Sequence, residues 1–125
     1  MRGTVTRVIT TLVLVSFAGI VTAGGRYANP PKGMVESHAA CVKALDAAQK
    51  GEKEVALEQT KIARKISIES YKEISTMPME VASSTTKRAI VAITADNMDD
   101  AIAELKHCKE KLDSEIDYYK KEGKL

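Results

Sequence analysis

Apolar residues recur at spacings of three and four in several stretches of this chain, a pattern that places them on one face of an α-helix. Short breaks at Gly51, Pro78 and Asp96 separate these stretches. Each break suits a helix end, because glycine closes a helix, proline fits the first turn of the next one, and aspartate caps an N-terminus. The pattern therefore predicts an all-α chain.

Four helices are expected, over residues 34–50, 53–75, 78–94 and 97–121. Their connections are short, so consecutive helices should lie antiparallel. A faint repeat of about 45 residues aligns the first helix pair with the second. We therefore expect an up-down-up-down four-helix bundle over residues 34–121, built from two αα-hairpins, with residues 122–125 as a C-terminal tail. The expected core positions are Met34, His38, Cys41, Leu45 and Ala48; Val55, Ile62, Ile66 and Tyr71; Val81, Thr85, Ala89 and Ala92; and Met98, Ala101, Leu105, Cys108, Leu112 and Tyr119.

The N-terminus has the composition of an export signal. Arg2 and Arg7 precede an apolar run of about 14 residues, which ends in the small-residue pattern Val21-Thr22-Ala23. Such a run is too short to span a bilayer comfortably. We expect residues 1–23 to be a cleaved signal peptide and residues 24–33 to be a flexible leader. The mature protein should then be periplasmic or secreted, with no integral membrane segment.

The mature chain is expected to be electrically neutral. The whole sequence has 19 Lys and Arg against 17 Asp and Glu, and the expected signal removes two arginines and no acid. A neutral domain has no general attraction to a phosphate backbone, so we expect no nucleic-acid partner. The sequence also has no glycine-rich phosphate loop and no Ser/His/Asp set, so we expect no enzymatic activity.

Cys41 and Cys108 are the only cysteines, and both fall on expected core stripes. Their helices, the first and the last, are adjacent in the expected topology. A rise of about 1.5 Å per residue from the turns puts the two cysteines at nearly the same height. An exported protein would meet an oxidising compartment, where such a pair forms a disulfide. The only histidines, His38 and His107, lie in the same layer, so the alternatives are a Cys2His2 metal site or no joint role.

A second candidate metal site lies at the break before the third helix. Met77 and Met79 flank Pro78 there. Thioether sulfur is a ligand for Cu(I), whereas methionines at such a place also serve to plug the end of a core.

Two Ala-rich stretches carry a family resemblance. They read His38-Ala39…Ala44…Ala47…Gly51…Ala56-Leu57-Glu58…Lys61 and Ala89…Ala92…Asp99-Asp100-Ala101-Ile102. These stretches resemble the small metal-binding protein family of bacterial periplasms, whose members are four-helix bundles that bind copper, nickel or zinc through repeated histidines. The resemblance implies a periplasmic bundle, with His38 and His107 as the histidine ligands that remain. Met77 and Met79 would be further ligands on the ground of their thioether chemistry.

Taken together, these features predict an exported, non-catalytic bundle that works by binding. The first hypothesis is a structural or accessory subunit that docks on a larger periplasmic or secreted complex. The alternative is a metal-binding bundle with a reduced ligand set, taking copper or another divalent metal. The thin supply of histidines favours the accessory subunit.

Overall fold

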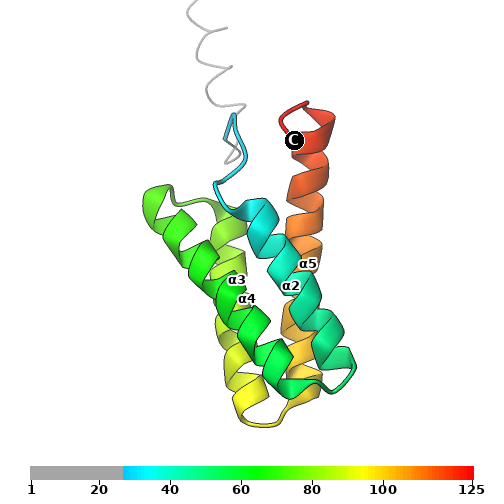
Figure 1. Cartoon of the computed structure of the whole chain (residues 1–125). Helices are drawn as coiled ribbons and strands as arrows, with labels where there is room; N and C mark the ends of the chain where they lie inside the picture. Colours follow the sequence, from blue (N-terminus) through cyan, green and yellow to red (C-terminus); the bar gives the residue numbers. More distant parts are fainter. Residues whose placement is uncertain (1–26) are drawn as a thin grey trace, which may run out of the picture.

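A computed structural model describes residues 27–125, which form four α-helices and contain no strand. The helices are α2 (Met34–Gln49), α3 (Lys53–Glu73), α4 (Met77–Thr94) and α5 (Met98–Lys121). Figure 1 shows each helix running antiparallel to the one before it. The expected all-α four-helix bundle is confirmed, and the helix ends fall within two residues of those expected. The expected signal peptide, residues 1–23, lies outside the described residues.

The four helices form a closed ring. Each consecutive pair is in contact, and α5 also packs against α2, so the first and last helices are neighbours (Figure 1). This closure gives every helix one face on the inside of the ring. None of the described helices is long and apolar enough to cross a membrane.

The two turns at the lower end of the bundle have the same backbone geometry. Gly51 and Asp96 both adopt a left-handed conformation, with φ of 76° and 58°. After each of them, the N–H of the next residue, Glu52 or Asn97, donates to the carbonyl five residues earlier at 2.8 Å. These bonds satisfy carbonyls that a helix end leaves unpaired. The Nζ of Lys53 lies 2.6 Å from a carboxylate oxygen of Asp96 and links the two turns.

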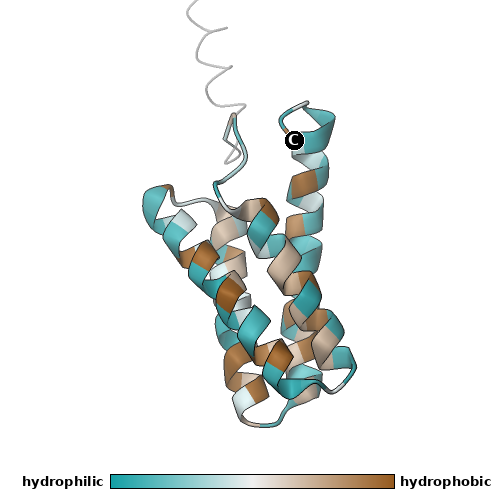
Figure 2. Ribbon diagram, viewed as in Figure 1, coloured by the Kyte–Doolittle hydropathy of each residue, from teal (hydrophilic) through white to brown (hydrophobic). Residues whose placement is uncertain are grey.

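Helix α3 faces the core with small residues, and the expected stripe was wrong there. Val55 and Ile62 are 45% and 41% exposed, and Ile66 and Tyr71 are only half-buried. Figure 2 shows brown, hydrophobic residues on the side of α3 that faces the viewer. The residues of α3 that do face the core follow a 4-3-4-3 spacing and are Ala56, Thr60, Ala63, Ser67 and Ser70.

Small side chains suit this interface because they let neighbouring helices approach closely. The Ser37 hydroxyl on α2 donates to the carbonyl of Ala63 at 3.2 Å, which requires the two backbones to be near each other. The buried hydroxyls of Thr60 and Ser67 donate to carbonyls of their own helix at 2.6 and 2.9 Å. Satisfied in this way, these polar groups are buried without leaving a hydrogen bond unmade.

The other three helices follow the expected core stripes closely. The largest fully buried apolar side chains are Met34, Met79, Ile93, Leu105 and Leu112. Three expected core residues, His38, Val81 and Met98, are half-buried at the edge instead. Sequence reasoning also missed Glu115, whose buried carboxylate lies 3.2 Å from the Nζ of Lys111 one turn earlier on α5.

Candidate binding sites

The disulfide joins α2 to α5 in the upper half of the core. Cys41 and Cys108 are bonded, their Cα atoms lie 6.6 Å apart, and both side chains are fully buried. The pairing expected from the sequence is confirmed. Sulfur in a disulfide is not a thiolate, so the Cys2His2 alternative does not describe this arrangement.

His38 lies beside the disulfide and is engaged by an acid. Its Nε2 lies 2.5 Å from Oδ1 of Asp113 on α5, and the other carboxylate oxygen of Asp113 accepts from Lys109 Nζ at 2.6 Å. Partial burial raises the pKa of Asp113, but the hydrogen bonds and charges of Lys109 and His38 outweigh this effect, and the pKa falls below its ordinary value. This cluster pins α2 to α5 one turn from the disulfide.

Replacing Asp113 with asparagine should remove a stability contribution that depends on pH. Because folding lowers the pKa of Asp113, the contribution is present above the unfolded pKa of about 3.9 and is lost as the pH falls through the lower folded value. The side chain is 41% exposed, so we expect less than about 1 kcal/mol. Melting temperatures from pH 2.5 to 6 should show wild type and Asp113→Asn converging at the acid end. A constant gap between them would contradict this role.

The remaining expected metal ligands have different surroundings. His107 is exposed on α5. Met77 is exposed, whereas Met79 is fully buried in the apolar cluster that contains the disulfide. Within residues 27–125, no group of three or more His, Cys, Asp or Glu side chains is arranged to hold a metal ion. Metal binding by these residues stays a prediction.

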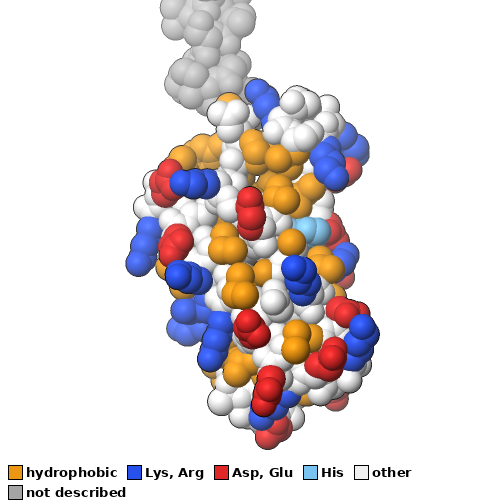
Figure 3. Space-filling model, in the orientation of Figure 1, with side chains coloured by type: hydrophobic (Ala, Val, Ile, Leu, Met, Phe, Trp, Pro, Cys, Tyr) orange, Lys and Arg blue, Asp and Glu red, His pale blue; other side chains and the backbone are white. Residues whose placement is uncertain are grey.

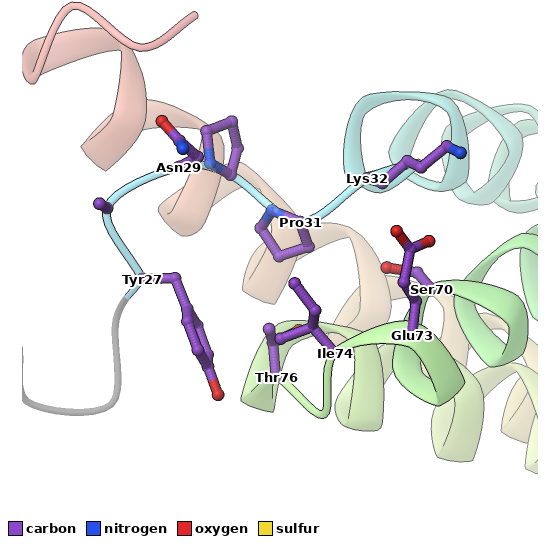
Figure 4. A pocket seen from close by; sticks show the side chains of 10 residues that line it. Tyr27, Asn29, Pro31, Lys32, Ser70, Glu73, Ile74 and Thr76 are labelled. Carbon is purple, nitrogen blue, oxygen red and sulfur yellow. The ribbon is translucent and has the colours of Figure 1, made fainter.

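A pocket of about 340 Å³ lies at the upper end of the bundle, between the leader and the α3–α4 connection. We call it the leader pocket. The Tyr27 hydroxyl donates to the carbonyl of Ser75 at 3.4 Å, and the Tyr119 hydroxyl of α5 donates to the carbonyl of Tyr27 at 3.0 Å. Figure 4 shows Tyr27 and Pro31 on one side and Ile74 and Thr76 rising from the α3–α4 connection toward them. The lining residues are Tyr27, Ala28, Asn29, Pro30, Pro31, Lys32, Ser70, Glu73, Ile74 and Thr76.

A second, more open groove of about 380 Å³ runs along α3 beside Ile90 of α4. Its walls carry the cations Lys61, Arg64, Lys65 and Lys72, none of which forms an ion pair with another described residue. Figure 3 shows Lys and Arg side chains gathered along the left flank of the molecule. The groove therefore carries a local excess of positive charge.

Sequence reasoning missed both the acid partner of His38 and the leader pocket. His38 precedes Cys41 on α2, and Asp113 follows Cys108 on α5. Because the two helices are antiparallel and joined at the cysteines, both residues lie on the same side of the disulfide, and this proximity could have been predicted from the sequence. Pro30 and Pro31 restrict the leader backbone, which was the one local hint that this segment has a preferred path.

Family models, curated proteins and solved structures gave no match to this chain. The resemblance to the periplasmic small metal-binding proteins therefore stays a prediction.

Proposed function

We propose that this protein is an exported, non-catalytic accessory bundle that docks on a larger protein complex through the outer face of α3. The observation that carries this proposal is the reversed placement of side chains on α3. Its small residues face the core, while Val55 and Ile62 face outward. A helix that served only its own bundle would bury its largest apolar residues.

The outward-facing apolar residues have the spacing of a helix–helix seam. They lie on α3 and are Val55, Ile62 and Ile66. We call these three residues the outer stripe. Separations of seven and four residues are those that a partner helix meets when it packs along a bundle. The occupant is therefore an apolar helix face of a partner subunit.

Charged residues surround the outer stripe and would form the rim of the interface with that partner. Glu36 and Lys43 of α2, and Glu58 and Lys65 of α3, are exposed and form no ion pair with another described residue. Figure 3, which views α2 and α3 from the front, shows hydrophobic side chains interspersed with charges of both signs. A mixed rim around an apolar centre is typical of protein–protein interfaces.

The test is a photo-crosslinking side chain placed at Ile62 in the native host, with Val91 of α4 as the matched control. Val91 is even more exposed, at 64%, but lies outside the outer stripe. We expect an adduct of defined mass from position 62 only, and its yield should fall when Val55 is replaced by serine. Equal adducts from both positions, or a native extract that holds only the free small species, would overturn the proposal. An adduct of two copies of this chain would assign the face to self-association instead.

A further inference from the structure

We propose that the leader pocket binds a small amphiphile with an apolar body and a carboxylate head. The carboxylate would lie at Thr76, where α4 begins, and the apolar body between the leader and Ile74. Three features carry this assignment: the walls of the pocket, a buried hydroxyl without a partner, and the helix end that the pocket adjoins.

The walls are mainly apolar and come from segments far apart in the sequence. Tyr27, Pro30 and Pro31 of the leader face Ile74 at the end of α3 (Figure 4). Two hydrogen bonds of Tyr27, one to the α3–α4 connection and one from α5, hold the leader over the bundle end. A volume of about 340 Å³ is within the range of small-molecule sites.

The hydroxyl of Thr76 is buried in this wall without a hydrogen-bond partner. Thr76 is 3% exposed, and its Oγ1 bonds to no other atom of the described residues. A buried hydroxyl in this condition costs free energy unless a ligand bonds to it. Figure 4 shows the Thr76 side chain directed up from the α3–α4 connection, toward the space below Pro31.

Thr76 is also the N-cap residue of α4, an 18-residue helix. A threonine at this position ordinarily accepts a bond from an N–H of the first turn, but Thr76 makes no such bond. The first N–H groups of a helix lack intrahelical partners and carry partial positive charge, so they favour an anion. Lys32 and Glu73 also line the pocket, and their opposite charges offset each other. The preference for an anionic head group therefore comes from the N-terminus of α4.

The experiment compares three ligands that share one chain, namely octanoate, octanol and octylammonium, on the mature wild-type protein. Calorimetry gives the affinities, and the amide signals of Thr76 and Met79 report the place of binding. We expect octanoate to bind most tightly and octylammonium most weakly. Tyr27→Ala should weaken octanoate and octanol alike, because it removes an apolar wall and not the contact with the head group.

Thr76→Val is the decisive variant, since valine keeps the shape and the extended backbone of this residue. We expect octanoate to bind about tenfold more weakly, with octanol less affected, while the melting temperature without ligand rises because a buried unpaired hydroxyl is gone. Thr94→Val is the control, because that hydroxyl donates to the Ile90 carbonyl at the other end of α4. No binding of octanoate, equal affinity for all three ligands, or an unchanged affinity in Thr76→Val would overturn the proposal.

Discussion

Replacing Cys41 and Cys108 together with alanine should lower the free energy of unfolding by about 4 kcal/mol. The bond closes a loop between residues separated by 67 positions, and confining the unfolded chain in this way accounts for an effect of that size. A domain of about 100 residues whose core is rich in alanine has a total stability of only about 5–10 kcal/mol, so this is a large share. Urea denaturation of the oxidised wild type and of the double variant measures the difference.

Reduction supplies the control for this prediction. A thiol reductant should lower the midpoint of the wild type toward that of the double variant and leave the variant unchanged. The intact mass of the unreduced protein after alkylation should show no modified thiol. Two alkylated cysteines in the native protein, or a loss below about 1 kcal/mol, would contradict the structural role of the bond.

The second large effect is expected at two neighbouring residues of α3. Hydrophobicity suggests that Ile62 is buried and Ala63 exposed, but the structure buries Ala63 and exposes Ile62. Ala63→Leu should cost about 3 kcal/mol, because position 63 is fully buried against α2 and the added atoms have no space. Ile62→Ala should cost less than about 1 kcal/mol, since Ile62 is 41% exposed and alanine favours the helix. Thermal unfolding of both variants by circular dichroism gives the comparison.

A graded variant keeps this test informative if Ala63→Leu does not fold. Ala63→Val adds less volume at the same place and should lose stability to an intermediate extent, with part of the loss due to its lower helix propensity. If Ile62→Ala proves more damaging than either substitution at position 63, then α3 turns its larger residues to the core and the outer stripe is not a free surface.

Local patterns were sufficient for the secondary structure and the connectivity of the bundle. The breaks at Gly51 and Asp96 were placed correctly, but the expectation that Asp96 caps the last helix was wrong. Asp96 adopts a left-handed conformation, and the Asn97 side chain caps α5 by accepting from the Asp100 N–H. The spacing of apolar residues on α2 and α5 also placed Cys41 and Cys108 at one height. These features depend on neighbours along the chain and on the fixed rise of a helix, so they can be predicted without knowledge of tertiary contacts.

The candidate sites were harder to predict, because each depends on distances between helices. The predicted core face of α3 was wrong. Both the stripe of large apolar residues and the stripe of small residues have helical spacing, and hydrophobicity alone selects the larger residues. The contact between His38 and Asp113 depends on how close α2 and α5 lie. The burial of Glu115 depends on Lys111, which lies one turn earlier on α5 and pairs with its carboxylate.

The sequence by itself determined that this chain forms four antiparallel helices with its two cysteines on facing stripes, because helix period, breaks and short connections act locally. Only the tertiary structure decided which stripe of α3 is buried. Close packing admits small residues between α2 and α4 and leaves Val55 and Ile62 outside. It also decided that the leader closes a pocket over Thr76, since that pocket exists only where the leader, α3 and α4 meet.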